Sequence, residues 1–309
     1  MPGSMALHIV GGPRPGTTRL RPLPAALLAS LRAGAPRDTP AARAEPVAGD
    51  VAEAFAAGDA HYARRGENAR GGTALPFHID GAIAEYRRAL ALDPRFFEAR
   101  LALMRAFFFR TGFCGPMDAG DEIRMYDEAK KLAEETVALL DADTGRRKAR
   151  VQVEAARAVT PAAEAYVWAA VSWGQWAVFH RLAAAWQGAP KRIRDLAETV
   201  LSIDPATAQA GAYVLLGRLH CEAPRIPMLT GWISREKGIA YLRQGLARAP
   251  DNPALAYFLA DALLTWDPSR RDEARALLER GVASKPRPDF LVEDVHYAEE
   301  ARQRLAALR

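Results

Sequence analysis

One pattern recurs along the chain and limits what it can fold into: small and large residues stand at fixed steps before a proline. Ala82, Tyr86 and Ala89 precede Pro94 by successive steps of four, three and five residues. Three more copies keep these steps: Ile193, Ala197 and Val200 before Pro205; Gly238, Leu242 and Gly245 before Pro250; and Ala274, Leu278 and Gly281 before Pro286. A further run, Ala129, Ala133 and Thr136, has Asp141 where proline would stand. Small residues let helices approach closely and proline ends a helix, so the pattern predicts stacked antiparallel helix pairs.

The residues around this pattern favour helix throughout. From about residue 48 onward Ala, Leu, Arg and Glu dominate, and no convincing stretch alternates apolar and polar residues as a strand would. The sequence therefore predicts an all-α solenoid that resembles tetratricopeptide (TPR) repeats, with the opening helix of each pair after the proline, as in residues 97–107. The intervals between copies are irregular, which predicts insertions and a longer helical hairpin between the second and third copies.

Charge divides the chain into two parts. Residues 1–47 hold six of the arginines, two acidic residues and eight of the 21 prolines, so they carry +4 of the formal net charge of +5. This composition predicts a disordered Pro/Arg-rich tail or a degenerate secretory signal, followed by a single helical repeat domain over residues 48–309. Because the body is close to neutral, the sequence pI of about 9.3 does not indicate a nucleic-acid partner. No apolar run is long enough for an integral membrane span.

Four stretches resemble the T-component (TatT-like) family of TRAP-type transporter systems. They are residues 58–66 leading into 82–94, the Trp-rich run 165–177, residues 200–224, and residues 238–250. The resemblance implies a helical repeat protein that works beside a periplasmic solute-binding protein. It also implies a periplasmic location, whereas the lack of a clear signal and of a lipid-attachment cysteine before Cys114 favours the cytoplasm. The chain departs from the family at one place: before the third repeat helix, the family often has the motif Gly-Gly-Asp, and this chain has the unrelated sequence of residues 227–234 instead.

Two segments contain candidate binding residues. The uncharged run 165–180 holds Trp168, Trp176 and His180, and it predicts either a helix buried on several sides or a helix that lines an apolar pocket. The segment 224–234 interrupts the repeat and holds Arg225 and Trp232. It is either a loop folded back over the core, with Trp232 as its anchor, or an insertion that touches a ligand or partner.

The run His220-Cys221-Glu222 offers chemical groups, but neighbours on a helix do not face one another. No HExxH motif, paired CxxC or phosphate-binding glycine loop stands in a suitable context, so we expect neither a metal nor a cofactor.

The leading hypothesis is a non-enzymatic protein that binds a partner through its concave face, with Trp168, Trp176, His180, Arg225 and Trp232 near that surface. By the resemblance, the partner is a solute-binding protein or another uptake component, with room for a small apolar ligand among the helices. One alternative is a general cytoplasmic TPR scaffold unrelated to transport. The other is a hydrolase that uses His220 and Glu222. The oligomeric state stays open.

Overall fold

The fold is built from α-helices. The computed structural model describes residues 48–147 and 159–308, and within these ranges it contains no strand, only two isolated β-bridges. The helices are α1 (Ala48–Ala63), α2 (Pro76–Leu92), α3 (Phe97–Phe113), α4 (Ala119–Arg147), α5 (Val159–Phe179), α6 (Arg181–Trp186), α7 (Ala189–Ile203), α8 (Thr207–Glu222), α9 (Arg235–Arg248), α10 (Pro253–Trp266), α11 (Arg271–Ala283) and α12 (Leu291–Ala306). Short 3-10 helices cover Pro268–Arg270 and Pro288–Phe290. The predicted all-α, TPR-like helical-repeat fold is confirmed. The predicted tail, residues 1–47, lies outside the described residues.

The repeated small and large residues are the contact points between helices. All fifteen residues of the pattern, from Ala82 to Gly281, are buried. A Cβ atom added at Gly58 would lie 2.5 Å from the Tyr86 ring, and one added at Gly238 would lie 2.5 Å from Sγ of Cys221. Small residues of the pattern such as Gly238 and Gly245 therefore mark positions where helices pack too closely for a larger side chain.

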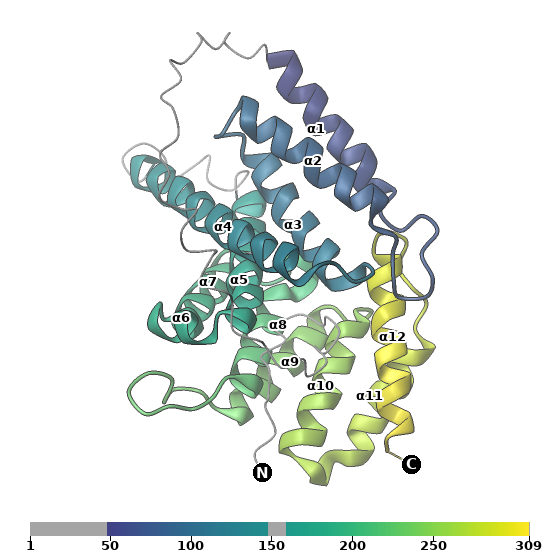
Figure 1. The fold of residues 1–309 in the computed structure, drawn as a ribbon. Helices are drawn as coiled ribbons and strands as arrows, with labels where there is room; N and C mark the ends of the chain where they lie inside the picture. The colour runs from purple at the N-terminus through teal and green to yellow at the C-terminus, as the bar shows by residue number, and fades with distance from the viewer. Residues whose placement is uncertain (1–47, 148–158, 309) are drawn as a thin grey trace, which may run out of the picture.

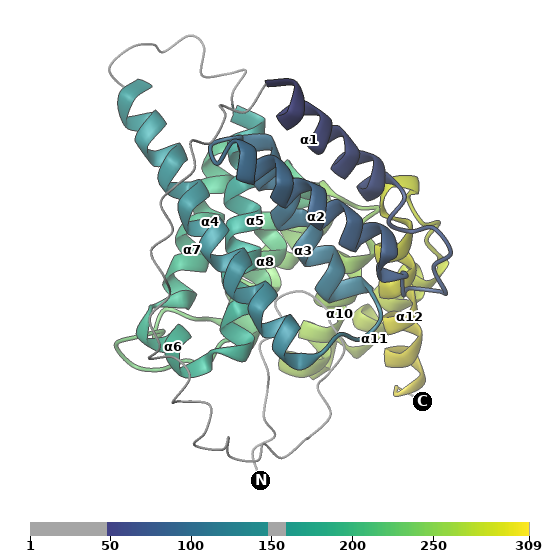
Figure 2. The same ribbon diagram turned by 45° about the horizontal axis from the view of Figure 1, so that its top comes forward.

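The helices form an inner and an outer row (Figures 1 and 2). Helices α3, α5, α8, α10 and α12 contact one another in that order, and α4, α7, α9 and α11 pack against them from outside. One continuous apolar core runs from α2 to α12. Each pair thus buries its apolar face against the next pair, as expected for a solenoid.

The two ends of the solenoid also touch. Arg65, after α1, forms a salt bridge of 3.2 Å with Glu293 of α12, and the backbone N–H of Gly72 donates to Glu299 at 3.2 Å. The Phe113 ring at the end of α3 lies 5.2 Å from the His296 ring, edge to face. Residues about 225 positions apart therefore meet, and α12 closes the row of inner helices (Figure 1).

Three local features depart from a regular repeat. Helix α4 continues past Asp141 to Arg147, because Asp141 keeps the N–H and the conformational freedom that proline lacks. Residues Ala208–Ala210 have positive φ angles of 51–63°, so the right-handed part of α8 starts late after Pro205. The short helix α6 is inserted between α5 and α7, and it lies near the long α8–α9 loop at one margin of the molecule.

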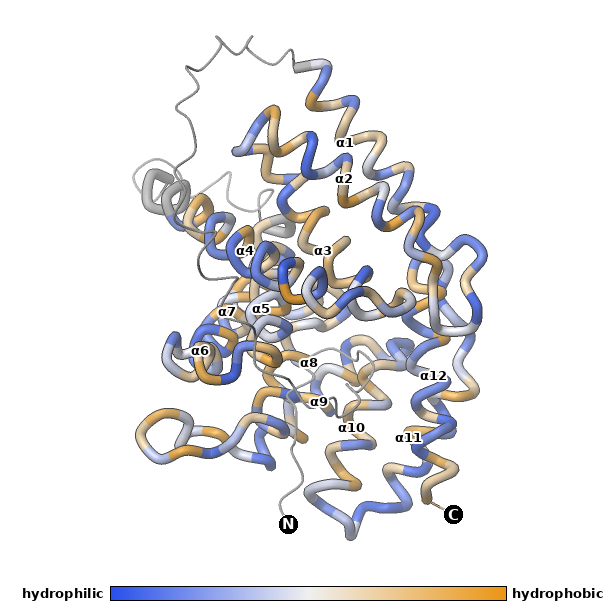
Figure 3. Tube along the Cα trace, viewed as in Figure 1, coloured by the Kyte–Doolittle hydropathy of each residue, from blue (hydrophilic) through white to orange (hydrophobic). Residues whose placement is uncertain are grey.

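Large apolar side chains of α6 and of the loop that follows α8 are exposed at that margin. The hydropathy colouring in Figure 3 marks hydrophobic residues in both segments. Among the described helices, none is both long enough and apolar enough to cross a membrane.

Candidate functional site

The loop between α8 and α9 is fastened at both ends. Nδ1 of His220 accepts a hydrogen bond of 3.0 Å from the backbone N–H of Ser234. The Arg235 guanidinium donates to the carbonyl oxygens of His220 and Ala223. The His220 ring stacks on Tyr241 and meets the edge of Trp232, with centroids 5.8 and 5.4 Å away. His220 is therefore a buried acceptor that holds the C-terminal end of the loop.

The environment of His220 favours its neutral form. Burial, together with smaller effects of the nearby cations Lys237, Arg194 and Arg235, lowers the pKa of His220 to about 4. A protonated ring would lose the Nδ1 lone pair that accepts from Ser234. His220 is thus neutral at pH 7, as its acceptor role requires.

The inside of the loop is held by its own polar groups. Thr230 accepts from the backbone N–H of Ile226 at 2.8 Å and donates to the carbonyl oxygen of Pro224. Nε of Arg225 donates to the carbonyl oxygen of Gly231 at 3.1 Å. The Arg194 guanidinium lies 4.2 Å from the Trp232 ring. Of the two alternatives for residues 224–234, the anchor role of Trp232 agrees with this packing, and Arg225 helps to shape the loop.

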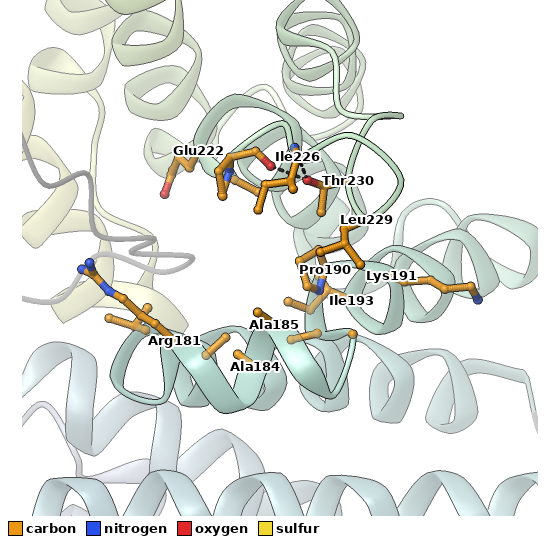
Figure 4. Close-up of a pocket in the computed structure, with 16 residues that line it drawn as sticks. Arg181, Ala184, Ala185, Pro190, Lys191, Ile193, Glu222, Ile226, Leu229 and Thr230 are labelled. Atoms are coloured by element: carbon orange, nitrogen blue, oxygen red, sulfur yellow. Dashed lines mark hydrogen bonds between the residues drawn. The ribbon is translucent and has the colours of Figure 1, made fainter. Parts of the chain in front are cut away.

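A cleft lies between this loop and the helices beside it (Figure 4). Its volume is about 260 Å³. The loop covers it with Ile226, Leu229 and Thr230, while Ala184 and Ala185 of α6 lie opposite. The other lining residues are Ala177, Val178, Arg181, Gly188, Ala189, Pro190, Lys191, Ile193, Glu222, Ala223 and Pro224. The lining is thus largely apolar, with charged groups from Arg181, Lys191 and Glu222, and it lies at the carboxyl ends of α5 and α8.

The charged groups of the cleft are themselves engaged. Glu222 forms a salt bridge of 2.5 Å with the buried Arg218, whose guanidinium lies 4.2 Å from the Phe258 ring. Burial raises the pKa of Glu222, and the Arg218 cation opposes that shift. Lys191 pairs with Asp195 one helical turn away.

The arrangement of His220, Cys221 and Glu222 does not support the hydrolase hypothesis. His220 faces Ser234, Cys221 lies against Gly238, and Glu222 faces Arg218, so the three groups point to three different neighbours. Burial raises the pKa of the Cys221 thiol to about 12, which keeps it protonated at neutral pH. A nucleophile and its base need to lie within hydrogen-bonding distance. Within the described part of the chain, no group of three or more His, Cys, Asp and Glu residues is placed to hold a metal ion.

Two of the predicted residues, Trp176 of α5 and His180 just after it, lie at the interface with α4. Nε1 of Trp176 donates to Asp127 at 2.9 Å, and the His180 ring stacks on Trp176 at 4.8 Å. The Lys130 ammonium group lies 4.8 Å from the Trp176 ring. Trp176 is buried. The first alternative for this run, a helix buried on several sides, agrees with these contacts.

Trp168 lies elsewhere on the same helix. Its ring is 5.4 Å from that of Phe108 on α3, and its indole N–H is buried without a hydrogen-bond partner. The structure therefore stacks His180 on Trp176 and places Arg225 and Trp232 in the same loop, but it does not join the five predicted residues in one site.

Sequence reasoning identified the loop 224–234 that covers the cleft, but it missed α6 on the opposite side. Four of the most exposed large apolar side chains described are Leu182 and Trp186 on α6 and Met228 and Leu229 in the loop. The sequence did contain a signal for α6: Leu182 and Trp186 are four residues apart, as on one face of a helix, in a run without acidic residues.

Comparisons with known proteins add a likeness in fold. No family model matches this sequence, and no curated protein matches it. Among solved structures, the chain is similar to the crystal structure of a thermophilic TPR protein from Thermus thermophilus. The two chains share 17% sequence identity with a TM-score of 0.46, and the match covers 83% of this chain and 97% of the other.

Proposed function

We propose that this protein is a non-enzymatic helical-repeat binding protein, and that the cleft beneath the α8–α9 loop receives an apolar segment of a partner protein. The observation that carries the proposal is the cleft itself: about 260 Å³, lined largely by apolar side chains, beside a loop fastened by His220, Thr230 and Arg235. A cavity of this size holds one or two apolar side chains. A loop already held in place loses little entropy on binding.

The partner that we propose is the solute-binding protein of a TRAP-type uptake system. Support comes from the resemblance of residues 58–66, 82–94, 165–177, 200–224 and 238–250 to the T components of such systems. The loop that lies over the cleft stands where this chain departs from that family. We therefore propose that the loop provides contacts particular to this protein and its partner.

The test is affinity capture from native cells with chemical crosslinking, using the full chain and two variants as baits. Ala185→Phe places a ring inside the cleft, because Ala185 is exposed and lines it. Gln187→Phe adds the same ring at the end of α6, at a residue that does not line the cleft. Identical melting temperatures for the three proteins would show that neither ring disturbs folding.

We expect the wild type and Gln187→Phe to capture a periplasmic solute-binding protein. Ala185→Phe should capture it at least about tenfold less well, which corresponds to about 1.4 kcal/mol. Equal capture by all three baits would reject the cleft as the binding site. Capture of cytosolic proteins alone, lost in the same variant, would reject the transport role and favour the general scaffold.

A further inference from the structure

Four large apolar side chains project into solvent beside the cleft. We call Leu182, Trp186, Met228 and Leu229 the apolar lip. Leu182 is 81% exposed, Trp186 90% and Leu229 61%, and Met228 is fully exposed. Of these four side chains, Leu229 lines the cleft and the other three do not. A ligand inside the cleft would therefore leave most of the apolar lip in water. Clustered large apolar side chains at such exposure mark an interaction surface.

The apolar lip comes from two segments that lie side by side. Leu182 and Trp186 are four residues apart and therefore share one face of α6. Ile226 and Leu229 of the loop face Ala184 and Ala185 of α6 across the cleft, which places the two segments next to each other. In Figures 1 and 2, α6 and the loop reach the same margin of the molecule. The apolar lip is thus formed by two adjacent segments whose large side chains project into solvent.

The chain around the apolar lip carries positive charge. Residues 165–194 contain Arg181, Lys191, Arg192 and Arg194 and no acidic residue, and residues 223–235 contain Arg225 and Arg235 and no acidic residue. Acidic groups lie next to these segments in the chain. Asp195 pairs with Lys191 and Arg194, Glu222 pairs with Arg218, and Glu236 accepts a hydrogen bond from the Ser234 hydroxyl. The cations around the lip, which include Lys237, still outnumber them. The body is close to neutral as a whole, but this margin is cationic.

Exposed Trp and Leu side chains beside Arg and Lys are the residue types that bind the interface of an anionic bilayer. We propose that the apolar lip docks on an anionic phospholipid membrane, with its apolar side chains in the interfacial layer and the surrounding cations near the lipid headgroups. The basic segment 1–47, at net +4, is disfavoured as the occupant, because it would meet like charge. An acidic protein is the alternative that the test distinguishes.

The test is cosedimentation of the full chain with large unilamellar vesicles. One set is phosphatidylcholine alone, and the other contains about one third phosphatidylglycerol. We expect binding to the anionic vesicles that weakens with added salt, and at least about tenfold weaker binding to the neutral ones. Absence of binding to both sets at low salt would overturn the proposal and leave the acidic protein as occupant.

Substitutions in the apolar lip test whether it is the part of the protein that contacts the vesicle. Replacing Met228 and Leu229 by serine together should weaken vesicle binding at least about tenfold, and the Leu182→Ser, Trp186→Ser pair should do the same. Lys191→Gln should weaken it about fivefold, the effect of one cation near the surface. All these side chains are exposed, so the melting temperatures should stay unchanged.

The matched control uses another exposed apolar pair. Leu75 and Phe77, at the start of α2, are 49% and 73% exposed. Leu75→Ser with Phe77→Ser should leave vesicle binding unchanged, and an equal loss in this control would reject the apolar lip as the contact. Ala185→Phe fills the cleft and not the lip, so it should keep vesicle binding. The membrane proposal and the partner proposal can therefore fail separately.

Discussion

Replacing His220 by phenylalanine tests whether this histidine holds the α8–α9 loop as a neutral acceptor. Phenylalanine keeps a flat ring against Tyr241 and Trp232, but it cannot accept the hydrogen bond from the Ser234 N–H. Leaving a buried donor unpaired costs about 1–3 kcal/mol. At pH 7 the variant should therefore be less stable than the wild type by about 2 kcal/mol.

The difference should reverse as the pH falls. In the folded state the pKa of His220 is about 4, against an ordinary value of 6.5, so between these values the unfolded chain binds more protons. The wild type keeps its full stability above the unfolded pKa and loses it as the pH falls toward 4. The difference between the two pKa values corresponds to a loss of about 3 kcal/mol at pH 4 and about 2 kcal/mol at pH 5. Because the variant lacks this titration, the two stability curves should meet near pH 5.

The assay is urea unfolding of both proteins at several values between about pH 7 and pH 4, followed by tryptophan fluorescence. Taking the difference between the two proteins removes the titrations that they share. His220→Gln is the matched control, because its amide can accept a hydrogen bond but does not titrate; it should be more stable than His220→Phe at pH 7. A wild-type minus variant difference that stays constant with pH would refute the reasoning.

Two further predictions concern packing and the contact between the ends of the solenoid. Gly238→Ala places a Cβ 2.5 Å from Sγ of Cys221 and 2.9 Å from the carbonyl oxygen of Gly217, so it should lower the free energy of unfolding by about 1–3 kcal/mol; Gly115→Ala, with no atom within 4 Å, should leave it unchanged. Arg65→Ala removes one partner of an ion pair in which each side chain is only 13% exposed, and it should lower the free energy of unfolding by about 3–5 kcal/mol. Its control is Arg243→Ala, in an exposed pair with Glu273, which should lower it by less than about 1 kcal/mol. Urea unfolding measures both pairs of variants, and similar losses in a variant and its control would contradict the argument.

Much of the fold was predictable because the repeat is a local signal. The small–large–small steps before each proline recur within a single helix, so helical periodicity is enough to mark which residues are buried. The structure buries all fifteen of them. The predicted antiparallel helix pairs followed from the same pattern.

The predicted site residues do not form one site in the structure, because the sequence shows residue types and not their spatial neighbours. Trp176 and His180 lie at the α4–α5 interface, and Trp232 anchors a loop beneath the Arg194 cation. His220, Cys221 and Glu222 are adjacent in sequence but face Ser234, Gly238 and Arg218. Helical periodicity indicated that these three neighbours diverge, and it places Arg218 one turn before Glu222. It does not report that His220 meets Ser234 or that Cys221 meets Gly238, because those contacts depend on the packing of separate segments.

The sequence by itself determined the class of fold and the repeated contacts between helices, since both depend on spacing within one helix. Only the tertiary structure decided that the chain closes on itself through Arg65 and Glu293, which are 228 residues apart. It alone placed α6 beside the α8–α9 loop, where they form a cleft, an apolar lip and a cationic margin. Such features arise where segments distant in sequence meet, and their energies depend on distances that a linear pattern does not contain.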